Sequence, residues 1–149
     1  MQTVHIYVET ENTSPRSTSR MAGYVLEYKK QSGEMKTAED FSQKIGTYHR
    51  AILLAMEDAL KRMNRPCELH IHTQDEYVLN SIDKYLHIWA ANGWRNKKGD
   101  LVKNHFEWSR LWRLLQGHLI VTEAGMHSRY SNMVTQMREK MREIQEVPE

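Results

Sequence analysis

Cysteine is almost absent from this sequence, because Cys67 is the single cysteine among 149 residues. No disulfide can form within the chain, and this content is typical of a reducing compartment. Long apolar runs are also absent, so no segment is expected to span a bilayer. The opening residues MQTVHIYVE alternate like a strand and lack the basic and apolar regions of a signal peptide. We therefore expect a cytoplasmic protein with no membrane partner.

Neither sign of charge dominates, since Lys and Arg total 21, Asp and Glu total 19, and the formal net charge is +2. Composition alone therefore does not indicate a nucleic-acid-binding protein, and any basic site must be a local patch. The sequence has no glycine-rich phosphate-binding loop and no serine or cysteine with an identifiable catalytic base. The length favours one domain covering residues 1–149, with residues 145–149 expected to fray.

Hydrophobic periodicity predicts nine elements of secondary structure. The predicted strands are residues 3–10, 21–30, 35–41, 67–73 and 118–122, and the predicted helices are residues 47–63, 75–92, 105–117 and 129–145. Three consecutive strands followed by alternating strands and helices favour an α/β fold. We expect a five-stranded mixed sheet flanked by helices on both faces.

This order of elements resembles the ribonuclease H family, and three segments of sequence agree with it. AMEDALKRM (residues 55–63) resembles the end of the family's first helix, and CELHIHTQDEYV (residues 67–78) resembles its fourth strand and the following turn. YLHIWAANGWRNKKGDLVKNHFEWSRL (residues 85–111) is similar to the family's basic protrusion. The resemblance extends from Val4 to about Met141 and implies the ribonuclease H fold.

The resemblance also implies an activity, the cleavage of RNA in RNA–DNA hybrids by two magnesium ions that four carboxylates hold. The matching positions of this sequence are Glu9, His49, Gln74 and Gln136, or Val134 if the last loop is aligned without a gap. The mobile histidine of the family corresponds to His127. Only Glu9 keeps a carboxylate, which predicts an inactive member that needs no cofactor.

Two further acids leave an alternative open. Glu11 follows Glu9 by two residues, and Asp75 is next to Gln74. A divergent nuclease that uses Glu9, Glu11, Asp75 and His49 with Mg²⁺ or Mn²⁺ is therefore the rival hypothesis. Histidines on two strands (His5, His70 and His72) suggest a transition-metal site, but their spacing is not compact, and half-exposed polar positions are the favoured interpretation.

The segment 94–104, WRNKKGDLVKN, is the best candidate for contact with nucleic acid. Its candidate contacts are Trp94, Arg95, Lys97, Lys98, Lys103 and Asn104. Lysine and arginine bind phosphates through charge, and a tryptophan beside them can pack on sugars or bases. In the alternative interpretation, the tryptophans pack the protrusion and the lysines are only solvated. Arg16, Arg20 and residues 29–30 are possible extensions of this basic surface.

The sequence thus predicts a catalytically inactive ribonuclease H-like protein that binds a hybrid or duplex through backbone contacts. The alternatives are the divergent metal-dependent nuclease and a protein-interaction module. The resemblance also fits an accessory protein of a mobile element or phage.

Overall fold

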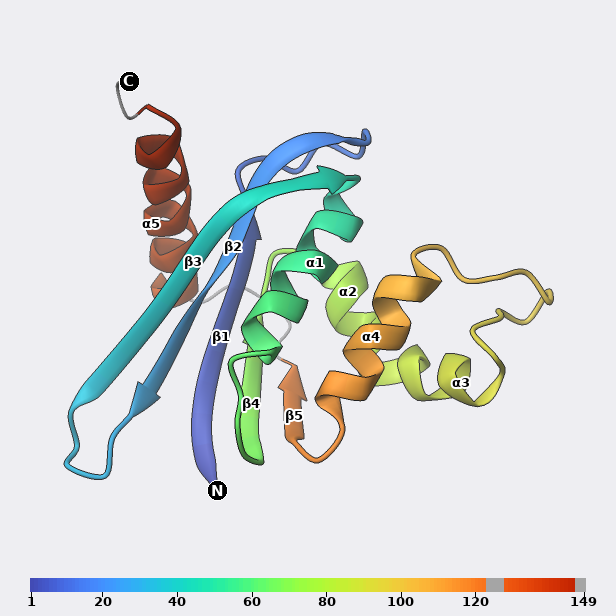
Figure 1. Ribbon diagram of the computed structural model, residues 1–149, viewed down its shortest axis with the longest axis horizontal. Coiled ribbons are helices and arrows are strands. Elements are labelled where there is room, and N and C mark those ends of the chain that lie inside the picture. Colours follow the sequence, from blue (N-terminus) through green and yellow to red (C-terminus); the bar gives the residue numbers. More distant parts are fainter. Residues whose placement is uncertain (123–127, 147–149) are drawn as a thin grey trace.

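The predicted strands form one mixed sheet in the order β3-β2-β1-β4-β5. In this computed structural model, which describes residues 1–122 and 128–146, the strands are β1 (Gln2–Thr10), β2 (Thr18–Lys29), β3 (Met35–Gly46), β4 (Cys67–His72) and β5 (Leu119–Thr122). β2 is antiparallel to β1 and β3, whereas β4 is parallel to β1 and β5. The predicted five-stranded α/β fold is therefore confirmed (Figure 1).

Helices cover both faces of this sheet (Figure 1). On one face, α1 (Tyr48–Leu60) packs over the alternate residues Val4, Ile6 and Val8 of β1, and α4 (His105–Leu115) packs against α1. On the other face, α5 (Ser128–Gln145) packs over Tyr7, the next residue along the same strand. Successive side chains of a strand point to opposite faces, so the alternation in β1 produces both cores.

Two predicted elements differ from the structure in detail. The helix predicted at residues 75–92 is present at residues 76–91, but it contains a π-helical turn η1 (Ser81–Tyr85) between α2 (Glu76–Asn80) and α3 (Leu86–Ala91). Apolar spacing locates the buried face of such a segment but does not detect the wider hydrogen bonding of a π turn. β3 continues beyond residue 41, because its backbone stays paired with β2 up to Gly46. β3 is an edge strand, and its added residues 42–46 (SQKIG) are mostly polar, so they lack the alternation of apolar residues that predicts a strand.

The connections bring three elements together at one end of the sheet. β1 and β4 are adjacent and parallel, so Glu9 and the turn after His72 lie at the same edge. α1 begins nearby, where the side chain of Thr47 accepts a hydrogen bond from the N–H of Arg50 (3.3 Å) and caps the helix. Within residues 1–122 and 128–146, no helix has both the length and the apolar composition to cross a membrane.

Gly23 allows close packing between β2 and β3, and its replacement gives the first prediction. A methyl group there would lie 2.5 Å from Cδ1 and 2.7 Å from Cα of Phe41. We expect Gly23→Ala to lower the free energy of unfolding by about 2 kcal/mol or more, because β3 must move. Gly33→Ala is the control: its Cβ meets nothing within 4 Å, and only its φ of +91° is strained. If denaturant unfolding showed a larger loss of stability for Gly33→Ala than for Gly23→Ala, the result would contradict this prediction.

Candidate functional site at the ends of β1 and β4

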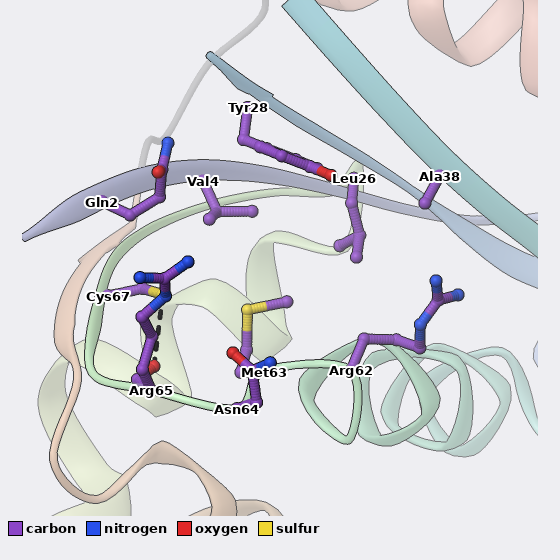
Figure 2. A pocket seen from close by; sticks show the side chains of 10 residues that line it. All are labelled: Gln2, Val4, Leu26, Tyr28, Ala38, Arg62, Met63, Asn64, Arg65 and Cys67. Carbon is purple, nitrogen blue, oxygen red and sulfur yellow. Dashed lines mark hydrogen bonds between the residues drawn. The ribbon is translucent and has the colours of Figure 1, made fainter. Parts of the chain in front are cut away.

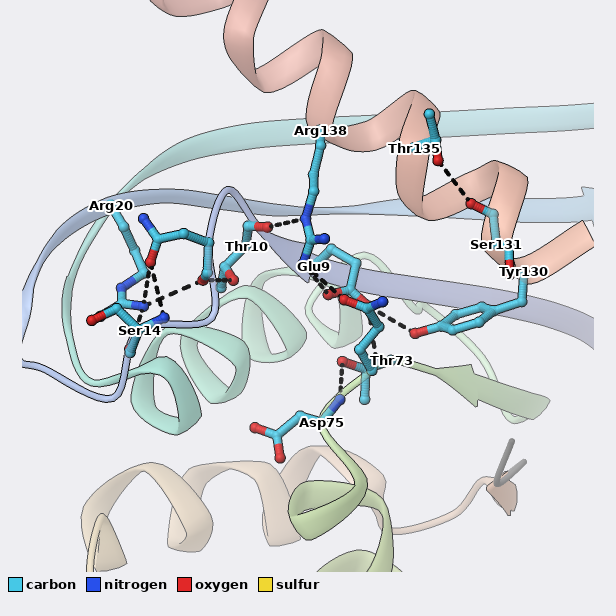
Figure 3. Close-up of polar contacts among 12 residues, drawn as sticks. Glu9, Thr10, Ser14, Arg20, Thr73, Asp75, Tyr130, Ser131, Thr135 and Arg138 are labelled. Atoms are coloured by element: carbon cyan, nitrogen blue, oxygen red, sulfur yellow. Dashed lines mark hydrogen bonds and ion pairs between the residues drawn. The ribbon is translucent and has the colours of Figure 1, made fainter. Parts of the chain in front are cut away.

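Glu9 is fully buried at the end of β1. Its Oε2 accepts hydrogen bonds from the backbone N–H of Gln74 (2.7 Å) and from the hydroxyl of Tyr130 (2.7 Å). Its Oε1 accepts no hydrogen bond from the described residues and lies 3.8 Å from Nη2 of Arg138 (Figure 3). Burial raises the pKa of Glu9 to about 7, although the two hydrogen bonds and the charge of Arg138 oppose this shift.

Arg138 reaches from α5 to the ends of both central strands (Figure 3). Its Nε donates to the carbonyl oxygen of Thr10 (3.1 Å), and its Nη2 donates to Oε1 of Gln74 (2.8 Å). The guanidinium thus connects β1, the turn after β4 and α5. It also places a permanent positive charge beside the carboxylate of Glu9.

A second polar pair lies at the start of α1 and α2. Asp75 is buried, and its Oδ1 caps α2 by accepting from the N–H of Val78 (3.1 Å). Its Oδ2 lies 2.6 Å from Nδ1 of His49, whose side chain is 43% exposed. The ring of Tyr77 lies beside that of His49, with 4.6 Å between their centroids.

Tyr48 links the two groups electrostatically. The hydroxyl of Tyr48 is buried, and it forms no hydrogen bond of normal geometry with any described residue. Burial raises the pKa of Tyr48, and the carboxylates of Glu9 and Asp75 raise it further. Burial and Glu9 likewise raise the pKa of Tyr130. Both phenols therefore stay protonated at neutral pH, and Tyr130 remains a hydrogen-bond donor to Glu9.

The structure brings four of the predicted positions together and separates the others. Glu9, His49, Gln74 and Asp75 lie within this connected set. Gln136 does not: it is exposed and lines a hollow between α5 and strands β2 and β3, together with Thr37 and Glu39.

Two of the remaining candidates, Val134 and Glu11, do not contact the carboxylate of Glu9. Val134 is buried in the apolar core between α5 and the sheet. Glu11 points elsewhere, because its carboxylate accepts from the N–H of Met21 (2.8 Å) and from Nε2 of Gln145 (3.0 Å). His127 lies outside the described residues.

The basic loop 94–104 is an ordered hairpin that extends beyond α3 and α4 (Figure 1). Oδ1 of Asn96 accepts from the backbone N–H groups of Lys98 (3.0 Å) and Asp100 (3.1 Å), and Arg95 bridges to Leu101. Lys97, Lys98 and Lys103 are exposed, as is Arg95, which donates to the carbonyl oxygen of Gly99.

Trp94 and Asn104 have structural roles at the two ends of this loop. Trp94 packs against the main core and has a positive φ of 66°. Asn104 is left-handed, with a φ of 63°, and precedes the first residue of α4. Asparagine tolerates this conformation better than other side chains. The lysines therefore carry most of the exposed charge of the loop, and the tryptophan supports them.

Two other sequence interpretations need correction. Arg20 is not part of a basic surface: it is buried, and its guanidinium donates to the carbonyl oxygens of Ser14 (2.8 Å) and Gly46 (3.1 Å). His72 is buried rather than half-exposed, with its Nε2 2.9 Å from Nδ1 of His5. Arg20 therefore holds the backbone in place, and His72 is part of the α5 side of the sheet.

A hollow of about 220 Å³ lies at the opposite end of the sheet and is separate from this site. Figure 2 shows it between the first residues of β1 and β4 and the loop after α1, with Arg62 and Arg65 at its rim. At about 3.3 Å per residue, Gln2 in this hollow is about 23 Å from Glu9 along β1.

Comparisons with known proteins agree with this fold and arrangement. Residues 2–124 match the model of the RNase H family, which is most of the chain. The chain belongs to the RNase H family. It is 32% identical over 131 residues to ribonuclease H of Rhizobium meliloti (strain 1021), covering 79% of this chain and 80% of that protein.

A shorter match is closer in sequence. The chain is 38% identical over 74 residues to ribonuclease HI of Xylella fastidiosa (strain Temecula1), covering 50% of this chain. The matched region is 49% of that relative, so the chain spans about half of its length.

Two solved structures show the same fold at low sequence identity. LC9-RNase H1, a type 1 RNase H with the type 2 active-site motif, superposes with a TM-score of 0.72 at 16% identity, covering 95% of this chain and 74% of that one. The foamy viral protease-reverse transcriptase in complex with an RNA/DNA hybrid gives a TM-score of 0.63 at 21% identity, covering 93% of this chain and 20% of that one.

The residues of this RNase H family member do not fit the pair of magnesium ions that the family implies. Glu9 and Asp75 are buried, and three of their four carboxylate oxygens already take part in hydrogen bonds. Arg138 would repel a dication beside Glu9. Among the described residues, no three His, Cys, Asp or Glu side chains gather in a way that could hold a metal.

Tyr130 and Arg138 were missed by sequence reasoning, although both lie on the predicted last helix. Comparison with the family directs attention to acids on that helix, and neither residue is one. The signal that was available is spacing: Tyr130, Val134 and Arg138 follow each other at intervals of four and share one face of a helix.

The raised pKa of Glu9 predicts a dependence of stability on pH. Its pKa rises from 4.5 to about 7 on folding, so the folded state holds the proton more tightly. The free energy of unfolding should therefore fall as pH rises from about 4.5 to 7, by roughly 3 kcal/mol from this group. Glu9→Gln has no such ionisation, so its stability should fall less over the same range.

Denaturant unfolding at a series of pH values measures this difference directly. Glu34→Gln, at an exposed position of the β2–β3 hairpin, is the control and should follow the unmodified protein. Parallel curves for Glu9→Gln and the unmodified protein would show that Glu9 ionises normally in the folded state.

Proposed function

We propose that this chain binds the backbone of an RNA–DNA hybrid or a similar duplex and does not cleave it by two-metal chemistry. The observation that carries this proposal is the contact of Arg138 and Tyr130 with the surroundings of Glu9. Two-metal cleavage requires several anionic oxygens that converge on a pair of cations. Here one buried carboxylate is already compensated by a hydroxyl, a backbone N–H and a guanidinium.

Other acids of the chain are committed to ion pairs that hold the fold. Glu57 is paired with Arg110, and Glu107 with Arg50, so these pairs tie α1 to α4. Asp58 is paired with Lys44 of β3. None of these acids supplies a metal ligand near Glu9, which supports a binding rather than a nuclease function.

The basic loop 94–104 supports binding to nucleic acid. Its lysines are exposed on an ordered hairpin, so their charges are available to phosphates. The similar foamy viral protein is described with an RNA/DNA hybrid, which makes a hybrid the first ligand to test. Contacts to phosphates carry no sequence information, so binding should depend weakly on base sequence.

We therefore predict that replacing Lys97, Lys98 and Lys103 by alanine weakens hybrid binding by about 10-fold to 100-fold at low salt. Each lost phosphate contact also lowers the slope of log affinity against log salt by about 0.9. Fluorescence anisotropy with a labelled hybrid measures both quantities.

The matched control replaces Lys29, Lys30 and Lys36 by alanine. These substitutions remove the same charge from the β2–β3 hairpin, which lies at the other end of the molecule from the loop 94–104 (Figure 1). This control should bind almost as well as the unmodified protein. Equal losses in the two triple variants would mean that the basic loop is not the binding surface.

A cleavage assay separates binding from nuclease activity. We expect no hydrolysis of the RNA strand with Mg²⁺ or Mn²⁺, because the described acids do not form a dication site. Cleavage that disappears in Glu9→Gln would establish the divergent nuclease instead. We further propose a reducing, cytoplasmic setting, which the free and buried thiol of Cys67 fits.

A further inference from the structure

We infer that the rings of His105 and Phe106, at the start of α4, stack on an unpaired base of the bound nucleic acid. This inference rests on the proposed function, because it names the form of nucleic acid that the region around the basic loop 94–104 prefers. The preferred ligand is then a hybrid that continues into a single-stranded segment, rather than a fully paired duplex.

Phe106 is a large apolar side chain that the fold leaves in solvent. It is 68% exposed, whereas Trp108 and Leu111 of the same helix are fully buried. At about 100° per residue, Phe106 is about 200° from Trp108 around the axis of α4, so it lies away from the buried face of the helix. The phenyl ring therefore adds nothing to the core and is available to a ligand.

The ring of His105 enlarges this exposed surface. Its centroid lies 4.3 Å from that of Phe106, and the two planes are inclined by 37°. His105 itself is half-buried, so it supports the phenyl ring from one side and leaves the other side open. Single exposed apolar residues are common on protein surfaces, but two aromatic rings in contact beside a cluster of cations are a more specific feature.

The charge beside these rings indicates what kind of ligand covers them. α4 begins where the loop 94–104 ends (Figure 1). This loop has one acidic residue, Asp100, against four basic ones: Arg95, Lys97, Lys98 and Lys103. Lys103 is three residues before Phe106, so their Cα atoms are at most about 11 Å apart. A ligand that matches both features carries negative charge and flat aromatic groups, as nucleic acid does.

The acidic residue in the first turn of α4 does not oppose such a ligand. Glu107 is buried, and its Oε1 lies 2.9 Å from Nε of Arg50. Its charge is therefore compensated on the α1 side of α4. The exposed groups at this end of the helix are the phenyl ring and the ammonium group of Lys103.

Stacking on an aromatic side chain requires a base that is not paired. Within a duplex both faces of each base are covered by the neighbouring base pairs, so side chains reach only the edges of the bases. Bases of single-stranded segments are free to stack on phenylalanine, tyrosine, tryptophan or histidine. The lysines of the loop then contact phosphates, and the two rings hold the first accessible unpaired base.

The test compares three labelled hybrids that share one paired region, each bound to the full chain and measured by fluorescence anisotropy. One hybrid is blunt, one has a single-stranded DNA extension of about six nucleotides, and one has the same extension without bases. The two extensions carry equal charge, so any difference between them comes from the bases. We expect the unmodified protein to bind the extension with bases about tenfold more tightly than the abasic one.

Variants at one position separate stacking from other contributions. Phe106→Ala should lose the tenfold difference and keep both the affinity for the blunt hybrid and the slope of log affinity against log salt, because no phosphate contact is removed. Phe106→Leu retains an apolar side chain without a flat ring and should lose most of the difference, whereas Phe106→Trp should retain it. The matched control is Ile45→Ala on β3, which removes an equally exposed apolar side chain and should behave like the unmodified protein.

Photochemical cross-linking gives a second, direct measurement. A 5-iodouracil base in the extension forms a covalent bond on irradiation with an aromatic side chain that is stacked on it. We expect mass spectrometry to locate this bond at residues 105–106. Cross-links found only elsewhere in the chain would overturn the inference.

The outcomes distinguish this inference from the proposed function. If the unmodified protein bound none of the three hybrids, the proposed function and this inference would both be wrong. Equal affinity of the unmodified protein for the two extensions would overturn this inference alone, and a protein partner would then be the better explanation of the exposed ring. A tenfold difference that persists in Phe106→Ala and Phe106→Leu would also overturn it, since another residue would then hold the base.

Discussion

Compensation of the buried Glu9 carboxylate is the constraint that organises this end of the molecule. A charge without water or partners is costly, and Glu9 obtains three partners from two separate parts of the chain. Tyr130 and Arg138 come from α5, and the N–H of Gln74 comes from the turn after β4. The same contacts attach α5 to the ends of β1 and β4. The stability of this layer and the chemistry of the site therefore depend on one network.

This network has a direct consequence for cation binding. A guanidinium that donates to Thr10 and Gln74 occupies the polar groups that would otherwise face a metal. Because arginine keeps its charge at all relevant pH values, the compensation is permanent and does not depend on an ion from solution. We propose that the protein binds phosphate through its own side chains, and the exposed lysines of the loop 94–104 are placed to do so.

The sequence predicted the strands of the sheet well, because the alternation of apolar and polar residues is a local feature of each strand. Alternation along β1 predicted a strand with two different faces. The parallel strands β4 and β5, which the helices between them connect, are adjacent, as is usual for consecutive strands. The resemblance to the family then placed Glu9, His49 and Gln74 correctly at one edge. It did not predict the pairing of Asp75 with His49, which depends on where β4 ends. β4 stops at His72, so residues 73–75 lie in a turn rather than on alternating faces of a strand.

The error at Gln136 shows which kind of sequence information is more reliable. Tyr130, Val134, Met137 and Met141 form the buried stripe of α5, and periodicity alone predicts that stripe. At about 100° per residue, Gln136 is about 200° from Val134, and it lies on the side of α5 that flanks β2 and β3. Alignment to the family gave Gln136, or Val134 if the last loop is aligned without a gap, so the choice depended on the alignment of that loop.

The phase of the helix instead places Arg138 next to the buried Met137, where a long side chain reaches the strand ends. Arg138 thus supplies, from the protein itself, the positive charge that lies beside Glu9. With Arg138 in that position, a second dication beside Glu9 is disfavoured by charge repulsion.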